Sequence, residues 1–325
     1  MVKLKGGDCR AILCSGNMAP GDPTHTEVAA SAHVPRNSQI ARAFEGFFSA
    51  LEARSIPYAD YFEASKGLPG ALLRAFDFSF VGGAQPMDLG APPKEGGALF
   101  TAPFITYGGM GSNHCARELL VGAAVSARSR LLVCAQHAHD VMPFDGYGGK
   151  TLVRALVELK RQMPAANLMV LKQVASSGLA DMRRAAFAEA HLFYAGVPQR
   201  VNKLAHDKFA VIDGAAIIST GNFTATQFAW GKRQMECTLP NCTVADAERA
   251  VARAIDLFKP PSGSVRVVPV RSSRGPPKVK VVKDDIFSEV NGLILLNDPA
   301  TADALARHFG ALWIHPASSD VVVPF

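Results

Sequence analysis

The sequence predicts an α/β fold of two duplicated half-domains, each a mixed sheet flanked by helices, with the first half truncated at its N-terminus. Two observations predict this class. Between residues 112 and 258, segments with the apolar spacing of helices alternate with short apolar segments typical of buried strands. In addition, residues 1–18 can be aligned without a gap on residues 206–223. A repeated segment of this length indicates a repeated architecture.

The alternating region contains four predicted helices and six predicted strands, two of them in a hairpin. Helices are expected at 112–127, 150–163, 178–195 and 243–258, strands at 130–136, 167–174, 197–203 and 235–239, and a hairpin at 206–220. Because strands alternate with helices, we expect a layered domain with helices on both faces of a sheet. Residues 1–55 are predicted to give short strands, a strand at 27–34 and a helix at 38–53, which is the end of a similar unit.

This pattern predicts four regions along the chain. Residues 1–55 form the remnant of the first half-domain, and residues 56–111, rich in Gly and Pro, form a connector. Residues 112–260 form the second half-domain. Residues 261–325 form a basic linker followed by a strand and a helix.

The two copies of the repeated segment share six identical residues at an offset of 205. The identical pairs are Lys3/Lys208, Asp8/Asp213, Ala11/Ala216, Ile12/Ile217, Gly16/Gly221 and Asn17/Asn222. The repeat continues beyond them, because Glu27 lies 21 residues before Phe48 and Glu236 lies 22 residues before Phe258. The chemically important mismatch is Met1, which stands where the second copy has His206.

The two copies of the repeated segment also differ in the length of chain that precedes them. In the second copy, 94 residues of predicted helix and strand separate Ser112 from His206, whereas Met1 begins the chain. We therefore expect that the natural protein starts earlier than this chain or, less favoured, that the chain is a permuted variant whose C-terminal segment supplies the missing elements.

Composition limits the partners more than it identifies them. A net charge of +6 and a pI of about 9.0 favour anionic partners such as phosphodiesters, nucleic acid or acidic membrane surfaces. No apolar run approaches the roughly 18 residues that a transmembrane helix needs, so no transmembrane segment is expected. The compartment is left open; a soluble, cytoplasmic protein is expected if the present start is natural.

The second copy carries a recognisable motif, H-x-K-x4-D followed by T-G-N. It resembles the HKD signature of the phospholipase D superfamily, over roughly residues 112–258 and 1–55. The matching residues are His206, Lys208, Asp213, Thr220 and Asn222. One departure is that Cys14 and Ser219 stand where the family motif usually has its first glycine.

The resemblance implies a two-histidine phosphodiesterase that forms a phosphohistidine and needs no metal or other cofactor. One neutral imidazole attacks phosphorus, and a protonated imidazole releases the leaving oxygen. Lys208 and Asn222 would hold the phosphate oxygens, and Glu236 would orient a histidine. The first copy would add substrate-phosphate contacts, together with Thr220; these residues are Lys3, Ser15, Asn17 and Glu27, the last as the counterpart of Glu236. Asp213 has the opposite strand parity to His206 and Lys208, which suits an anchor.

Because Met1 stands at the position of the first-motif histidine, only one of the two histidine roles is expected to remain. In the family, the histidine of the first motif is usually the nucleophile, so the resemblance leaves His206 as the general acid. We therefore expect the chain to be nearly inactive unless two chains pair as a homodimer, and an extended chain with His in place of Met1 to gain about 10²-fold or more.

The predicted function is phosphodiester hydrolysis or transfer of the phospholipase D type, on phospholipid or a related phosphodiester. One alternative is a nuclease or a tyrosyl-DNA phosphodiesterase-like enzyme that acts on nucleic acid. Another is a degenerate, non-catalytic phosphate-binding homologue. His137 and His139, in the segment HAHD after the strand 130–136, are candidates for the lining of the cleft or, less favoured, for a metal site.

Overall fold

A computed structural model of the chain describes residues 1–3, 7–15, 25–76, 86–94, 96–139, 151–173, 179–224, 227, 231–260, 263–270, 277–287 and 290–321. The chain divides into two compact units. Unit 1 comprises Met1–Phe47, Asp88–Ala229 and Glu289–Phe325, and unit 2 comprises Phe48–Met87 and Trp230–Ser288.

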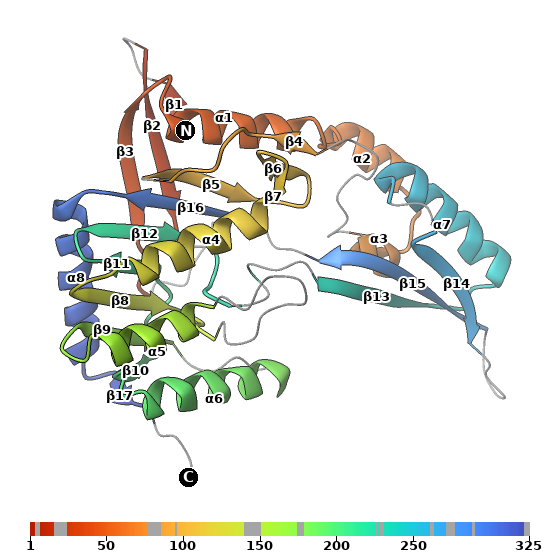
Figure 1. The fold of residues 1–325 in the computed structure, drawn as a ribbon. Helices are drawn as coiled ribbons and strands as arrows, with labels where there is room; N and C mark the ends of the chain where they lie inside the picture. Colours follow the sequence, from red (N-terminus) through yellow and green to blue (C-terminus); the bar gives the residue numbers. More distant parts are fainter. Residues whose placement is uncertain are drawn as a thin grey trace. The chain divides into compact units, whose positions relative to one another are not determined.

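Unit 1 contains an eight-stranded mixed sheet, in which β11 lies between β8 and β12 (Figure 1). β8, β9 and β10 are parallel, and the remaining neighbours are antiparallel. In sheet order the strands are β17 (Ser318–Asp320), β10 (Gln199–Asn202), β9 (Asn167–Lys172), β8 (Arg130–Ala135), β11 (Lys208–Ile212), β12 (Ala215–Ser219), β16 (Asn291–Leu296) and β5 (Gly97–Thr101). All five residues of β11 are buried, as expected for a strand covered on both faces.

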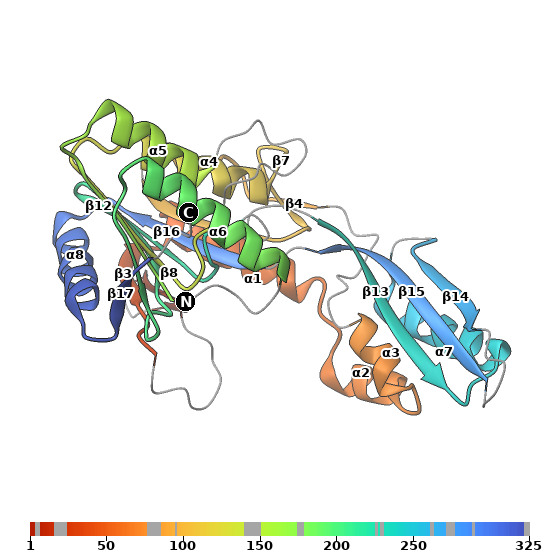
Figure 2. The same cartoon turned by 90° about the horizontal axis from the view of Figure 1, so that it is seen from below.

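Helices cover this sheet on both faces. Figure 2 shows α4 (Ser112–Val125), α5 (Leu152–Gln162) and α6 (Leu179–Tyr194) on one face and α8 (Pro299–Ile314) on the other. The apolar residues of α5 recur at three- and four-residue spacing, and the Thr151 hydroxyl caps its start by accepting from Arg154 N at 3.1 Å. Asp298 caps α8 in the same way, directly before Pro299. The predicted α/β layering is therefore present in unit 1.

A three-stranded antiparallel sheet from the start of the chain also belongs to unit 1. Its strands are β1 (Val2–Lys3), β2 (Asp8–Cys14) and β3 (Ala29–Pro35), and α1 (Gln39–Glu52) follows. Burial alternates along β2, so one face of the strand is buried. On that face Leu13 approaches Gly292 of β16 so closely that a Cβ there would lie 2.9 Å from Leu13 Cδ1. The N-terminal strands thus pack on the large sheet.

Short strands complete the first unit. β4 (Met87–Asp88), β6 (Ile105–Tyr107) and β7 (Met110–Gly111) form a further small sheet. β5, within the region 56–111 that was predicted as a connector, is instead the edge strand of the large sheet.

Unit 2 has its own sheet and its own apolar core. The sheet order is β13 (Gly231–Pro240), β15 (Lys278–Phe287) and β14 (Val265–Val270). The sheet is covered by α3 (Gly70–Phe76) and α7 (Val244–Phe258), and α2 (Tyr58–Ser65) packs against α7. Leu72, Phe76, Phe258 and Val281 lie in its core. The structure thus groups α7, predicted as the last helix of the second half-domain, with segments from the predicted connector and linker, because their apolar faces bury one another.

Candidate active site

His206 lies directly before β11, beside a segment from the N-terminal sheet. His206 N donates to Thr26 O at 3.3 Å, and Thr26 N donates to Leu204 O at 2.7 Å. Thr26 and Ala205 form a parallel bridge. The backbone at Thr26 is therefore bonded to the segment that carries the motif histidine.

The imidazole of His206 meets a carboxylate from this neighbouring segment. His206 Nδ1 contacts Glu27 Oε1, and the two side chains are 12% and 29% exposed. The other carboxylate oxygen of Glu27 accepts from Ser15 Oγ at 2.5 Å, and the buried Ser15 hydroxyl in turn accepts from Val28 N at 3.1 Å. Ser15, predicted as a phosphate ligand, thus positions Glu27. A carboxylate at Nδ1 favours the tautomer that carries its proton there and leaves Nε2 bare.

Lys208 shares the face of β11 on which His206 lies, as residues two apart in a strand do. Its Nζ donates to His206 O at 2.7 Å and to Ser15 O at 3.2 Å, and lies 3.3 Å from His206 Nδ1. Burial lowers the pKa of Lys208, while the negative charges of Glu27 and Asp207 oppose this shift. An ammonium group has three hydrogens, so one remains for an anion after the two carbonyl bonds.

Asp207, which lies between His206 and Lys208, points to the opposite face of the chain. Asp207 is fully buried, and its carboxylate accepts from Thr26 Oγ1 at 2.5 Å and lies 3.3 Å from Nε2 of His308 on α8. The hydrogen bond to Asp207 raises the pKa of His308, partly offset by burial. Thr26 and Asp207 thus fasten the N-terminal segment to β11 behind the site, whereas Glu27 meets His206 in front of it.

Asn222 and the histidines after β8 come together at the same edge of the sheet. Lys208 pairs with Ala135, the last residue of β8. Beyond it, His137 N donates to Asn222 Oδ1 at 3.2 Å, and Asn222 Nδ2 donates to Gln136 Oε1 at 3.3 Å. His137 and His139 have ring centroids 6.0 Å apart. This edge lies beyond the carboxyl ends of parallel strands, where α/β sheets usually bind ligands.

Thr220 repeats the geometry of Ser15. Thr220 N donates to Gly292 O at 2.9 Å, and its hydroxyl accepts from Gly292 N at 2.9 Å. Ser15 makes the same pair of bonds with Val28, at 2.9 and 3.1 Å. In both places the hydroxyl holds the next strand and leaves its hydrogen free to reach another acceptor, which for Ser15 is Glu27.

Asp213 lies at the other end of β11. Its carboxylate accepts from the backbone N–H groups of residues 128–130 at 2.8 to 2.9 Å and from Ser129 Oγ at 2.7 Å. Burial would raise the pKa of Asp213, but these hydrogen bonds outweigh it and lower the pKa. Because Lys208 and Asp213 bound the strand at opposite ends, Asp213 anchors β11 to β8 and is not beside His206.

Lys3 and Glu236 have other partners in the structure. Lys3 pairs with Cys9, whereas the register of β11 and β12 would place it opposite Cys14. At about 3.3 Å per residue, Cys9 lies roughly 20 Å along the chain from Ser15. Glu236 belongs to unit 2, where Oε2 pairs with Lys280 Nζ at 2.6 Å. The described carboxylate that contacts His206 Nδ1 is that of Glu27, the counterpart of Glu236 in the first copy. Asn17 lies outside the described residues.

The packing of Met1 shows where the first residue lies in the N-terminal sheet. It packs against Cys9, Val34 and Ala41, at the end of β2 that is remote from Ser15. The N-terminal hairpin therefore does not reproduce the position that His206 has beside β11.

His25 is a further residue at this site, and the motif does not predict it. Its ring is stacked on that of His206, with centroids 5.7 Å apart and planes inclined by 20°. The signal that could have found it is H-T-E at 25–27. If Glu27 faces the site from an extended segment, His25 faces it too.

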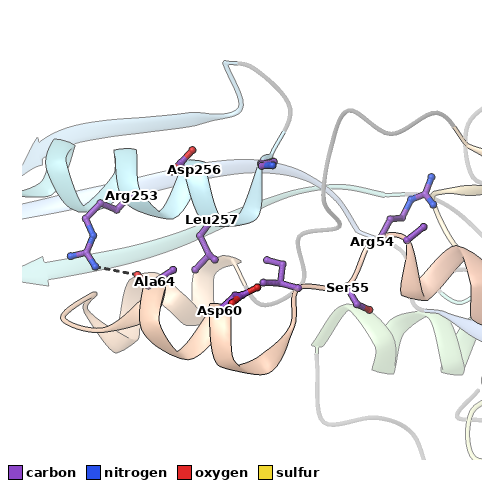
Figure 3. Close-up of a pocket in the computed structure, with 10 residues that line it drawn as sticks. Arg54, Ser55, Asp60, Ala64, Arg253, Asp256 and Leu257 are labelled. Carbon is purple, nitrogen blue, oxygen red and sulfur yellow. Dashed lines mark hydrogen bonds between the residues drawn. The ribbon is translucent and has the colours of Figure 1, made fainter.

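Outside this site, a cavity of about 520 Å³ lies in unit 2 (Figure 3). It is lined by both acidic and basic side chains, among them Arg54, Asp60 and Asp256, and Arg253 Nη2 donates to Ala64 O at 3.1 Å. Its lining includes no histidine or cysteine. Among the described residues, no group of three or more His, Cys, Asp or Glu side chains gathers as a metal site would require, and no helix has the length and apolarity to cross a membrane.

Comparisons with known proteins give remote structural likenesses. No family model matches the sequence, and no curated protein matches it. Among solved structures, the chain is similar to NucT from Helicobacter pylori, at 8% identity and a TM-score of 0.35, over 67% of this chain and 96% of that one. It is also similar to phosphatidylserine synthase from Haemophilus influenzae Rd KW20, at 9% identity and a TM-score of 0.34. That match covers 62% of this chain and only 35% of the synthase.

Proposed function

We propose that the protein is a phosphodiesterase of the phospholipase D type that forms a phosphohistidine on His206. The observation that carries the proposal is the contact of Glu27 with His206 Nδ1, beside the buried ammonium of Lys208. A carboxylate on one ring nitrogen makes the other a better nucleophile, and a fixed cation stabilises the charge that develops on phosphate oxygens.

The roles of the neighbouring residues follow from their free donors. Lys208 would bind one non-bridging oxygen through its remaining hydrogen, and Asn222 would bind another through its amide. Gln136 and His137, which contact Asn222, would hold that amide in place. The chemistry requires no metal, because Lys208 supplies the positive charge and the imidazole supplies the nucleophile.

His206 takes the nucleophilic role in this proposal, although the resemblance alone made it the general acid. Met1 cannot attack phosphorus, and it packs at the remote end of β2. His206, with its Nδ1 held by Glu27, is the imidazole of the motif that is prepared for attack.

Phospholipid or a related partly apolar phosphodiester is the proposed substrate class. Nucleic acid, including a tyrosyl-DNA linkage, presents the same phosphodiester and is the alternative. The two differ in their response to salt: affinity for nucleic acid falls steeply as salt rises, whereas action on a lipid depends mainly on the aggregated substrate. A non-catalytic phosphate-binding protein is the third reading, and it would bind phosphate through Lys208 without turnover.

The test uses bis(p-nitrophenyl) phosphate with excess EDTA. We expect the full chain to release p-nitrophenol and to form an alkali-stable phosphoryl adduct on His206. His206→Gln should lose at least about 10²-fold of the rate. The exposed His33, on β3, gives the control variant His33→Gln, which should keep the rate. Turnover that EDTA abolishes, or that survives in His206→Gln, would overturn the proposal.

A further inference from the structure

We infer that His25 is a catalytic residue, the acid–base partner of His206, and this inference rests on the proposed function. In the motif family a second imidazole comes from the other motif, but here that position is Met1. The structure brings a different histidine to the site. The rings of His25 and His206 are stacked, at 5.7 Å between centroids.

The backbone explains why His25 is there. Thr26 is bridged to Ala205 and bonded to Leu204, so the segment 25–27 runs beside the segment that leads into β11. Side chains in such an extended segment alternate between two faces. Thr26 points to Asp207 on the far face, whereas Glu27 meets His206 on the near face. His25 has the parity of Glu27 and lies on the same face.

The separation of the two rings fits an in-line displacement. The attacking nitrogen and the leaving oxygen lie on opposite sides of phosphorus, and the acid lies one hydrogen bond beyond the leaving oxygen. With an approach of 3 to 3.5 Å and a hydrogen bond of about 2.8 Å, the two nitrogens are expected roughly 6 to 7 Å apart. The ring centroids lie 5.7 Å apart, so the nitrogens of the two rings can reach this separation when a phosphodiester lies between them.

The reaction then balances with two imidazoles. Nε2 of neutral His206 attacks phosphorus, the N–P bond forms, the P–O bond to the leaving group breaks, and protonated His25 gives its proton to the leaving oxygen. In the second step His25 takes a proton from water, the oxygen of that water attacks phosphorus, and the N–P bond breaks. His206 returns to its neutral form and His25 to its protonated form, so no oxidant or co-reactant is required.

The two steps depend on His25 to different degrees, which gives a sharp test. p-Nitrophenolate leaves readily without a proton, so His25→Gln should still transfer the phosphoryl group to His206. The second step has lost its base and should fall by about 10² to 10⁴. With bis(p-nitrophenyl) phosphate we therefore expect a burst of about one p-nitrophenolate per chain, slow turnover afterwards, and an accumulated adduct on His206.

Two further variants separate catalysis from folding. His25→Gly should show the same burst and should regain turnover when imidazole is added, which a merely structural role would not allow. The exposed His33→Gln, on β3, should behave as the unaltered chain.

The outcomes are distinguishable from those of the proposed function. If the unaltered chain forms no adduct on His206, the proposed function fails. If it forms the adduct but His25→Gln turns over at the unaltered rate, only the role of His25 is overturned. Loss of the burst itself in His25→Gln and His25→Gly, with unchanged folding by circular dichroism, would also contradict the acid–base role.

Discussion

Glu27 contacts His206 across 179 residues of chain, and its second oxygen accepts from the buried Ser15 hydroxyl at 2.5 Å. The carboxylate is therefore held from both sides, with one oxygen for the histidine and one for the serine. An imidazole whose carboxylate cannot turn away keeps one tautomer and one orientation. This relationship ties the N-terminal sheet to the motif and gives the first prediction.

Glu27→Gln should lower the rate of adduct formation on His206 by about 10²-fold. The neutral amide holds the imidazole less firmly than the carboxylate does, and it stabilises a positive charge on the ring less well. Ser15→Ala should have a smaller effect, about tenfold, since Glu27 keeps its contact with His206. The measurement is single-turnover p-nitrophenol release. Glu158→Gln, an exposed pair with Arg154 on α5, is the matched control; equal rates in Glu27→Gln and Glu158→Gln would contradict the orienting role.

Lys208→Met should abolish the binding of vanadate or phosphate, because the anion would lose its buried cation. The pH dependence follows from the lowered pKa of Lys208, whose main cause is burial. The ammonium binds anions below its pKa, so anion affinity should fall as pH rises, and should do so below the ordinary lysine value of 10.5. Isothermal calorimetry between pH 7 and pH 10 measures this. Anion binding that persists in Lys208→Met would place the anion site elsewhere.

The pair of His308 and Asp207 should stabilise the fold more in acid than in alkali. The folded pKa of His308 is raised above its usual value of 6.5, first by the hydrogen bond to Asp207. A group with a raised pKa contributes fully below its unfolded pKa, and the contribution is lost as pH rises through the folded pKa. The unfolding free-energy difference between the unaltered chain and His308→Gln should therefore be larger at pH 5.5 than at pH 8.5. Since the His308 side chain is 33% exposed, we expect this difference in unfolding free energy to be below about 1 kcal/mol. Urea unfolding at both values measures it, and a difference that grows with pH would be contrary to the assignment.

The layered unit and the positions of His206, Lys208 and Asn222 could be predicted from the sequence, because they depend on strand alternation and on local spacing. β11 lies in the middle of the sheet, and Lys208 follows His206 on one face. The partners of these residues could not be predicted, because they depend on pairing between distant segments. The sequence shows that Thr26 and Glu27 would face opposite sides of an extended segment. It does not show that Thr26 is bridged to Ala205, which brings this segment beside His206. The partner of Glu236 could not be predicted for the same reason, since its strand pairs with β15 in unit 2.

Asp213→Ala should destabilise the fold and leave the chemistry intact. The carboxylate satisfies three backbone N–H groups at the start of β8, and the residue adopts a left-handed backbone, φ 50°, which disfavours Ala more than Asp. We expect a loss of about 2 to 3 kcal/mol with an unchanged rate per folded chain, because Asp213 lies at the end of β11 away from Lys208. Thermal unfolding and single-turnover kinetics test the two parts. The control is Asp303→Ala, which removes the exposed partner of Arg130.

Met1→His should give no gain in turnover in this chain, although the aligned motifs alone would predict a gain of about 10²-fold or more. Position 1 packs against Cys9, Val34 and Ala41, and the hairpin register puts Lys3 opposite Cys9, near the far end of β2 from Ser15. A histidine added there would lie remote from His206, whereas His25 is already stacked on it. We therefore expect Met1→His to match the unaltered chain, and Met1→His combined with His25→Gln to be as slow as His25→Gln alone. A rate for the double variant that returns to the unaltered level would show that the N-terminal hairpin can bring position 1 to the site, and the register of β1 with β2 would then have to change in the working enzyme.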